Sequence, residues 1–486
     1  MPTLRVTLLQ PNPKSGDFAG NLAAAASLAK HETDLVIAPI GTIEGGTGQA
    51  ALQWPDLRAA YETVLASVPE AFGGRTVLLL SGTPEAPQWH LWEKGTVKSG
   101  GWPALLSVGG VTFGADDEAD VRLDAADFST APSRRTAAPS EKLFLSAGIA
   151  GGQDQMIFAG DTGFSVDGES VRLPAWSAGA MTLLLEKGAR KVSASLLETD
   201  SAAPVPLADD ERYEALRAAL RDYVAKSGVK GIVLGLSGGI DSALSATLAA
   251  DAIGASRVRV VRLPSRFTSG LSNDAAQALA ERQGLRLDTL PIESLFDEFN
   301  AVLAPVFKDC AWDITEENIQ ARVRGTLLMA LANKYGLLLL CNGNKAEAAM
   351  GYGTLYGDLT GGFAPLADLW KDDVRALCRA RNASAVSPDV IPEEIIEREP
   401  SAELREGQKD SDSLPPYALI ERVVEHVAAG GAVADLADVD PAEARRIVKR
   451  LLGNAFKRAQ GIPGPILTQT PLSLFSAWGI NCRREF

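Results

Sequence analysis

The alternation of apolar, strand-like runs with longer helical stretches after residue 210 restricts the fold more than any other feature of this sequence. The expected strands are 231–236, 258–264, 285–291 and 337–344, and the expected helices are 211–226, 241–253, 272–283 and 316–335. Strands separated by helices of this length favour a parallel sheet with helices on both faces, a doubly wound α/β fold. Ligands of such sheets bind beyond the carboxyl ends of the strands. The informative loops are therefore 237–242, 264–270 and 342–358.

The first 200 residues follow a different pattern, with short apolar runs set between clusters of glycine, proline and serine. We expect an α+β layered domain here, with residues 114–142 as a surface loop and 201–210 as a linker. The predicted domains are therefore 1–205 and 206–486. The expected strands are 4–10, 34–39, 75–82, 143–152, 155–160 and 181–185, and the expected helices are 21–30 and 57–68.

Composition narrows the classes of function. The chain has 486 residues, 46% of them hydrophobic, and a net charge of −14, which fits a folded protein and argues against wide contact with nucleic acid or a membrane surface. We find no signal-like apolar segment and no apolar span of membrane length, so we expect a cytoplasmic protein. The cysteines Cys310, Cys341, Cys378 and Cys482 are scattered, which indicates neither a zinc site nor a disulfide framework.

One loop reads SGGIDS directly between a strand and a helix. Its glycines, Gly238 and Gly239, allow backbone N–H groups to point toward an anion. The hydroxyls of Ser237 and Ser242 add donors, and the helix N-terminus adds partial positive charge. Asp241 provides a carboxylate that could hold Mg²⁺ against bound phosphates. The alternative is a glycine-rich turn whose Ser or Asp only caps the helix.

This loop resembles the pyrophosphate loop of the ATP pyrophosphatases (adenine nucleotide alpha hydrolase-like), which activate a carboxyl or carbonyl group by adenylylation. The chain from residue 211 onward is similar to NAD synthetase in five further segments: 317–324, 343–347, 351–358, 400–404 and 410–417. The resemblance implies a two-step reaction that uses ATP and Mg²⁺, in which deamido-NAD is adenylylated and then amidated by ammonia. It also implies a homodimer or a larger homo-oligomer.

The same resemblance assigns roles to single residues. Asp241 and Glu347 would hold Mg²⁺, Asp358 would lie where ammonia attacks, and Lys345 and Lys371 would act in catalysis. The expected ATP-binding residues are Ser237, Gly238, Gly239, Asp241, Ser242 and Lys371. The expected deamido-NAD-binding residues are Glu317, Asn318, Gln320, Arg322, Arg324, Tyr352 and Thr354. Taken without the resemblance, the charged residues of the helix are typical of a solvated helix face.

The first domain is faintly similar to the nitrilase-like glutaminase domain that produces ammonia in many NAD synthetases with a Glu, Lys, Cys triad. Segments 4–21, 151–154 and 158–160 carry this similarity. Residues 1–309 contain no cysteine, however, and Ile40 stands where the family has its catalytic glutamate. Because the attack on glutamine needs a thiolate, we predict a degenerate remnant of a nitrilase-like sandwich. We also predict an enzyme that uses ammonia and not glutamine.

Other interpretations stay open at this point. They are glutamine-dependent NAD synthesis with ammonia from a separate glutaminase, a related enzyme such as a GMP synthetase, and a nucleotide-binding regulator without catalysis. Segments 317–322, 356–358 and 412–417 argue against the GMP synthetase. The regulator is disfavoured by the intact set Ser237, Asp241, Lys345, Glu347, Asp358 and Lys371. Two departures from the family pattern, Ala346 for Ser or Thr and Ala455 for an acid, leave the local contacts there in question.

Overall fold

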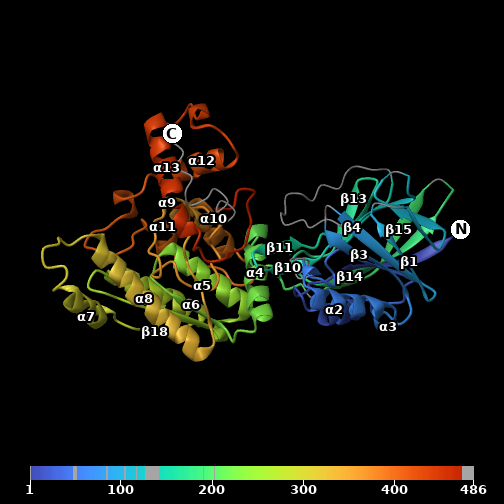
Figure 1. The fold of residues 1–486 in the computed structure, drawn as a ribbon, viewed down its shortest axis with the longest axis horizontal. Coiled ribbons are helices and arrows are strands. Elements are labelled where there is room, and N and C mark those ends of the chain that lie inside the picture. The colour runs from blue at the N-terminus through green and yellow to red at the C-terminus, as the bar shows by residue number, and fades with distance from the viewer. Residues whose placement is uncertain are drawn as a thin grey trace. The chain divides into compact units, whose positions relative to one another are not determined.

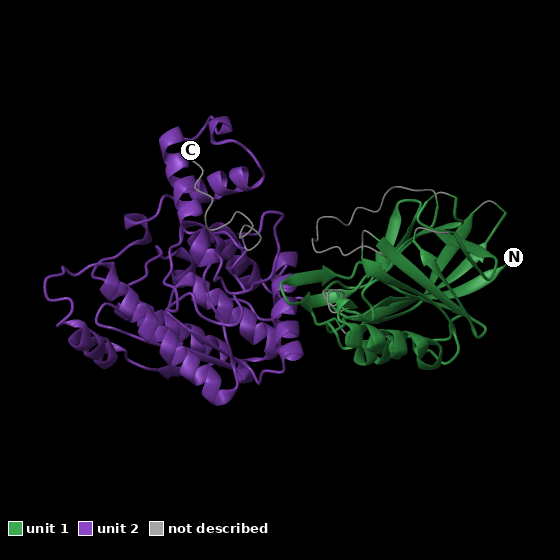
Figure 2. Cartoon of the chain, viewed as in Figure 1, with its two compact units in different colours: residues 1–205 green, residues 206–486 purple. Residues whose placement is uncertain are grey.

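The computed structural model divides into two compact units, Met1–Val205 and Pro206–Phe486, which are described separately (Figure 2). Among the residues that the structure describes, no helix is both long enough and apolar enough to cross a bilayer. The structure describes residues 2–46, 52–83, 86–102, 105–116, 118–125, 142–189, 191–201 and 203–472.

A parallel four-stranded sheet forms the centre of the second unit, in the order β18-β17-β16-β19. Its strands are β16 (Ile232–Gly235), β17 (Val258–Arg262), β18 (Arg286–Thr289) and β19 (Leu338–Leu339). The helices between them are α5 (Ile240–Ile253), α6 (Gly270–Gln283), α7 (Glu293–Leu303) and α8 (Ile314–Tyr335), after the leading α4 (Glu211–Ser227) (Figure 1). The predicted α/β class is confirmed, while α7 was not expected from the sequence.

Alternate strand residues face opposite helical layers. Val233, Val261 and Leu339 are buried together with Ala332 of α8. Two other helices, α5 and α6, also contact β16 and β17. Both sheet surfaces are thus covered, which explains the nearly continuous apolar strands.

The strand order reverses beside β16. The chain runs from β16 to β17 and β18 on one side and then returns to place β19 on the other side. Such a reversal separates the loops that leave neighbouring strands and opens a crevice between them. The SGGIDS loop leaves β16 at this point, so the topology by itself places it at the expected ligand position.

Three helices of the C-terminal part form a separate apolar cluster, namely α9 (Lys345–Met350), α12 (Tyr417–Ala428) and α13 (Pro441–Gly453). Trp370, which directly precedes α10 (Lys371–Asn382), joins this cluster. The same part of the chain also contains the short helices α11 (Glu393–Glu397) and α14 (Ala455–Arg458). Ala346 is 1% exposed within this cluster, beside residues such as Trp370 and Val423. A small apolar side chain suits this environment, which accounts for the first departure from the family pattern.

The first unit contains two large sheets and helices on one side of them. The seven-stranded sheet is β15-β14-β1-β2-β3-β4-β5, and the six-stranded sheet is β13-β12-β9-β8-β7-β6. A large core cluster includes residues of both sheets, and a second cluster joins the seven-stranded sheet to α1 (Phe18–Leu28), α2 (Pro55–Ala66) and α3 (Val68–Ala71) (Figure 1). The layered arrangement agrees with the predicted nitrilase-like sandwich. Its strands are β1 (Thr3–Gln10), β2 (Leu35–Ala38), β3 (Thr76–Thr83), β4 (Ala86–Glu93), β5 (Thr96–Gly101), β6 (Leu106–Val108), β7 (Val111–Gly114), β8 (Val121–Asp124), β9 (Phe144–Ser146), β10 (Ala150–Gln153), β11 (Met156–Ala159), β12 (Gly163–Val166), β13 (Glu169–Arg172), β14 (Gly179–Lys187) and β15 (Val192–Ser201).

Part of the expected surface loop 114–142 was assigned wrongly. Strand β8 lies inside it, and its apolar residues Val121 and Leu123 are buried in the core. The polar residues around these two positions hid a strand whose apolar side chains alternate with polar ones. Residues 126–141 of this expected loop lie outside the described residues.

Ile40 follows β2 at the position where the resemblance expects a general base. Its side chain is 1% exposed and belongs to the apolar cluster of the two sheets. An aliphatic side chain in a dry core can neither accept nor release a proton. The degenerate character of this domain stays a prediction, with this burial as its structural context.

Candidate active site

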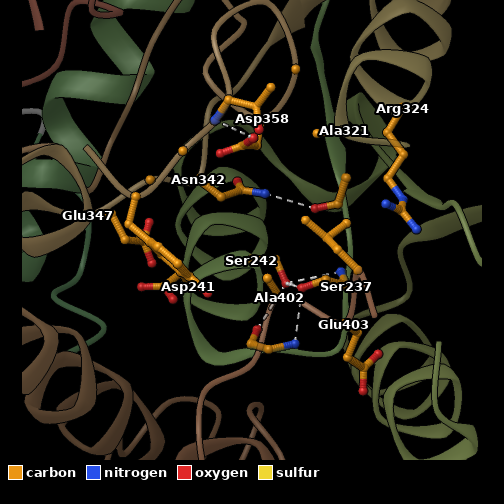
Figure 3. Close-up of a pocket in the computed structure, with 18 of the residues that line it drawn as sticks. Ser237, Asp241, Ser242, Ala321, Arg324, Asn342, Glu347, Asp358, Ala402 and Glu403 are labelled. Carbon is orange, nitrogen blue, oxygen red and sulfur yellow. Dashed lines mark hydrogen bonds between the residues drawn. The ribbon is translucent and has the colours of Figure 1, made fainter. Parts of the chain in front are cut away.

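A cavity of about 680 Å³ lies in the second unit beside the carboxyl end of β16 (Figure 3). A volume of this size accommodates a nucleotide-sized ligand. Most of the predicted site residues line it. They are Ser237, Gly239, Asp241, Ser242, Glu317, Asn318, Arg322, Arg324, Glu347, Tyr352, Thr354, Asp358 and Lys371.

The SGGIDS loop is shaped by its first glycine. Gly238 has a φ of 81°, and a Cβ atom there would lie 2.3 Å from the carbonyl oxygen of Ser272. Only glycine allows both the backbone conformation and this close approach to α6. The hydroxyls of Ser237 and Ser242 lie 3.0 Å apart, and the Ser242 hydroxyl donates to the carbonyl oxygen of Gly239 over 2.9 Å. The loop is therefore held in one shape at the N-terminus of α5, where an anion is favoured.

A lysine and two carboxylates meet next to this loop. Nζ of Lys371 lies 2.5 Å from Oδ2 of Asp241 and 3.9 Å from Oε1 of Glu347. The amide of Asn344 joins the two acids, because its Nδ2 donates to Asp241 Oδ1 over 3.1 Å and to Glu347 Oε1 over 2.8 Å. Burial and the nearby Asp241 carboxylate raise the pKa of Glu347 to about 8, against the opposing charge of Lys371. The two carboxylates thus lie close together and repel each other when both are ionised.

This pair of acids has the donor chemistry that Mg²⁺ requires. Asp241 and Glu347 both offer hard carboxylate oxygens, and Mg²⁺ is commonly held by one or two carboxylates plus substrate phosphates. The described residues contain no group of three or more His, Cys, Asp or Glu side chains arranged to hold a metal. A cation between these two acids would therefore take its other ligands from phosphate or water.

The wall opposite the loop comes from α8 and from residues 351–358. The hydroxyl of Thr354 donates to Oδ1 of Asn318 over 2.8 Å, which attaches this segment to the helix. The backbone N–H of Thr354 donates to Oδ1 of Asp358 over 2.9 Å. The side chain of Asp358 is exposed to the cavity, but desolvation by the protein atoms around it raises its pKa, and the nearby positive charge of Lys457 opposes the shift. Asp358 is therefore a carboxylate with stronger basicity than usual at the cavity surface.

Two arginines extend from the same helix. Arg322 donates from Nε to the carbonyl oxygen of Leu355 over 3.2 Å. Arg324 donates from Nε to the carbonyl oxygen of Leu263 over 3.0 Å, and burial lowers its pKa to about 10. Both guanidinium groups keep further N–H donors, which suits phosphate or carboxylate recognition.

Three predicted site residues do not line the cavity: Lys345, Gln320 and Gly238. Lys345 is fully buried, and its Nζ lies 2.8 Å from Glu425 Oε1 and 3.2 Å from Asp368 Oδ1. Gln320 is also buried and donates from Nε2 to the carbonyl oxygen of Leu404 over 2.9 Å. The structure thus gives Lys345 and Gln320 positions inside the protein, and Gly238 acts through the shape of its loop.

Sequence reasoning gave no role to several charged residues of the cavity. Asp410 accepts hydrogen bonds from the hydroxyls of Tyr352, over 3.1 Å, and Tyr417, over 2.7 Å. Lys457 donates to the carbonyl oxygens of Gly351, over 2.7 Å, and Gly353, over 2.6 Å. These residues lie in or near segments that resemble the family. Their types alone did not distinguish them from surface charges, so only the resemblance could have indicated them.

Comparison with known proteins identifies the family. The model of the family described as NAD synthase matches residues 212–461, which is slightly more than half of the chain. The chain belongs to the NAD synthase family. The matched residues include the SGGIDS loop and the whole parallel sheet, so the predicted family is confirmed and the region that builds the cavity carries the family pattern.

Curated relatives and solved structures agree with this assignment. The glutamine-dependent NAD(+) synthetase of Rhodobacter capsulatus is 46% identical over 331 residues, which cover 66% of this chain and 59% of that protein. The corresponding protein of Xanthomonas campestris is 41% identical over 65% of this chain and 58% of its own length. The match thus spans less than two thirds of these relatives. The structure of glutamine-dependent NAD+ synthetase from Acinetobacter baumannii in complex with ADP has a TM-score of 0.71 and 28% identity, and covers 100% of this chain and 98% of that one.

These relatives correct one prediction of the sequence analysis. We expected an NAD synthetase that uses ammonia and not glutamine, but the relatives that match about two thirds of the chain are named glutamine-dependent. The ammonia-only prediction is therefore wrong. Its weak step was the inference from the missing cysteine, because that absence in residues 1–309 concerns one nucleophile and not the origin of the nitrogen.

Proposed function

We propose that this member of the NAD synthase family catalyses glutamine-dependent NAD synthesis, with ATP and deamido-NAD as substrates and ammonia delivered by a partner glutaminase. The observation that carries the proposal is the cavity that the SGGIDS loop, the Asp241–Lys371 pair and Asp358 line together. The named relatives support the overall reaction.

The first step needs charge neutralisation more than a covalent nucleophile. A carboxylate oxygen of the nicotinate group attacks the α-phosphorus of ATP, the bond from that phosphorus to the bridging oxygen breaks, and pyrophosphate leaves with the electron pair. The SGGIDS loop would hold the leaving pyrophosphate through N–H and hydroxyl donors. Lys371 would offset its charge. Bound Mg²⁺ would supply further charge neutralisation, held by Asp241 and Glu347.

The second step needs a base. The nitrogen of ammonia attacks the activated carbonyl carbon, the carbon–oxygen bond to AMP breaks, and AMP leaves with the electron pair. The nitrogen must then lose a proton. Asp358 is suited to accept it, since desolvation by the surrounding protein raises its pKa above the ordinary value of an aspartate.

The proposal of a partner glutaminase rests on the cysteines. Residues 1–309 contain none. Burial raises the pKa of the Cys341 thiol to about 12 and also raises that of Cys378, so neither is a ready thiolate. Cys310 is exposed and lies outside the residues that line the cavity, and Cys482 lies outside the described residues. A homodimer and a cytoplasmic location remain predictions from the resemblance and the sequence.

One assay tests the proposal. Purified protein with deamido-NAD, ATP and Mg²⁺ is given glutamine alone, glutamine with a purified glutaminase, ammonium, or no nitrogen source, and NAD is measured. We expect NAD with glutamine plus glutaminase, and with ammonium as the competence control. No NAD in any arm would reject the reaction. Equal rates with glutamine alone and with added glutaminase would reject the partner.

A further inference from the structure

Residues 398–404 cross the cavity wall and are attached at both ends. Leu404 accepts a hydrogen bond at its carbonyl oxygen from Gln320 of α8 over 2.9 Å. At the other end, Arg398 reaches the first turn of α6, and Glu403, next to Leu404, reaches the same turn. Ser401 and Ala402 lie between these attachments and line the cavity, with Ala402 and Glu403 visible in Figure 3.

The attachment to α6 is a closed set of hydrogen bonds. Glu403 Oε1 accepts from the Ser272 hydroxyl over 2.9 Å and from Nη2 of Arg398 over 2.8 Å. Arg398 also donates to the hydroxyl oxygens of Ser272, over 2.7 Å, and Ser269, over 3.2 Å. The backbone N–H of Ser269, the N-cap residue of α6, donates to Glu403 Oε2 over 3.3 Å. One carboxylate and one guanidinium thus bind both serines of the turn.

The backbone conformation of Glu403 indicates that its surroundings hold this residue in place. Its φ is 49°, in the left-handed region that non-glycine residues adopt only under strain. Such a conformation persists where the surroundings fix it, and here the hydrogen bonds of the side chain do so. The negative charge of Glu403 also partly offsets the lowering of the Arg324 pKa by burial.

The same turn of α6 touches the phosphate loop. The carbonyl oxygen of Ser272 occupies the space that a Cβ atom of residue 238 would need, 2.3 Å from its ideal position. A shift of this turn would therefore move the SGGIDS loop or leave its glycine without support. Through Ser272, the position of Glu403 is coupled to the position of the pyrophosphate donors.

We propose that Glu403 and Arg398 are positioning residues that fasten residues 398–404 to the first turn of α6 and thereby fix the phosphate loop for ATP. The inference rests on the proposed function for its link to turnover, but its core claim concerns ATP binding alone. Neither residue needs to touch the substrate. Their effect is to keep the donors of the loop in place before ATP arrives, which lowers the reorganisation needed on binding.

The experiment compares Glu403→Gln with Glu397→Gln. Glu397 lies six residues earlier, outside the cavity lining, and also pairs with an arginine, Arg379, on the surface. The dissociation constant of ATP with Mg²⁺ is measured by calorimetry, and KM for ATP and kcat are measured by pyrophosphate release. We expect Glu403→Gln to weaken ATP binding about tenfold and to raise KM more than it lowers kcat, as for loss of a charge-assisted hydrogen bond. Glu397→Gln should match the wild type.

Two further measurements keep the outcomes separate. Ser272→Ala removes one hydroxyl of the same set and should weaken ATP binding in the same direction, with a melting temperature close to that of the wild type; it serves if Glu403→Gln fails to fold. Unchanged ATP affinity in the folded variants would overturn the proposal. A wild-type protein that binds ATP but makes no NAD would instead reject the proposed function, and the ATP titrations would still test the role of Glu403.

Discussion

Nζ of Lys371 lies 2.5 Å from Oδ2 of Asp241, although 130 residues separate the two in the chain. Burial favours the neutral amine, but the carboxylates of Asp241 and Glu347 outweigh it and raise the pKa of Lys371. The lysine is therefore a fixed positive charge, and it lies where the proposed reaction releases pyrophosphate.

Replacing Lys371 by methionine should reduce pyrophosphate release by at least about 100-fold, because a preorganised charge at a phosphate-transfer site contributes several kcal/mol to the transition state. The measurement is steady-state pyrophosphate release at saturating ATP. Lys334→Met is the control, since this lysine is exposed near the end of α8. A variant with more than a third of the wild-type rate would contradict the role of Lys371.

Asp358→Asn should separate the two steps. The amide keeps the size of the side chain and can still accept the hydrogen bond from the backbone of Thr354, but it is not a base. We expect pyrophosphate release within about threefold of the wild type and NAD formation lower by at least about 100-fold, the usual range for loss of a general base. Parallel assays of pyrophosphate and NAD test this. Equal losses in both products would instead indicate a role in binding or folding.

Lys345→Met should affect stability before chemistry. The lysine is fully buried against Asp368 and Glu425, and its removal would leave the buried Asp368 carboxylate without its cation. Breaking a buried pair from one side costs about 3–5 kcal/mol of unfolding free energy. Chemical denaturation of the variant, with the exposed Lys449→Met as control, measures this loss. A stable variant without turnover would restore the catalytic role that the sequence analysis gave to Lys345.

Glu44→Gln should stabilise the first unit at high pH. Glu44 is buried, its Oε1 accepts from the Tyr61 hydroxyl over 2.9 Å, and its Oε2 has no hydrogen-bond partner among the described residues. Burial raises the pKa of Glu44 above its ordinary value of 4.5. The unfolded chain therefore loses this proton first, and the stability of the wild type falls as pH rises above about 4.5, by up to ~1.4 kcal/mol per pH unit.

The glutamine variant cannot ionise, so its melting temperature should exceed that of the wild type at pH 8 and approach it near pH 4.5. Thermal unfolding at several pH values measures the difference. Glu62→Gln, an exposed change on the same helix as Tyr61, is the control. A constant difference between Glu44→Gln and the wild type at every pH would show that Glu44 does not titrate as described.

Local sequence patterns predicted the part of the site that one continuous strand–loop–helix segment forms. Ser237 and Asp241 could be placed because a strand, a glycine-rich loop and a helix follow one another directly. Local patterns could not show which of Lys345 and Glu347 faces the cavity, because the two residues are only two positions apart in the same segment. Positions two apart on a helix point in different directions, and the apolar cluster formed with α12 and α13 decides which one faces the cavity.

The first unit shows the same limit in its strands. Strand β1 is buried over most of its length and is visible as an apolar run, whereas β5 (Thr96–Gly101) is largely exposed and carries no apolar alternation. Its place is set by antiparallel pairing with β4. The local sequence does not reveal a pairing of this kind, because an edge strand has a neighbour on only one side and needs no buried apolar pattern of its own.

The short strand β19 has a consequence for how this protein matures. It joins the sheet only through Ile232 with Leu338 and Val233 with Leu339, which lie more than 100 residues apart in the chain. Closing so long a loop is entropically costly and slow, so we expect the pairing of β16 with β19 to form late in folding. Asp241 follows β16 and Glu347 follows β19, so the pairing of these two strands brings the two acids together. A newly synthesised chain would therefore complete the proposed site for Mg²⁺ and ATP only when this last pairing has formed, and bound nucleotide would stabilise fully folded molecules over partly folded ones.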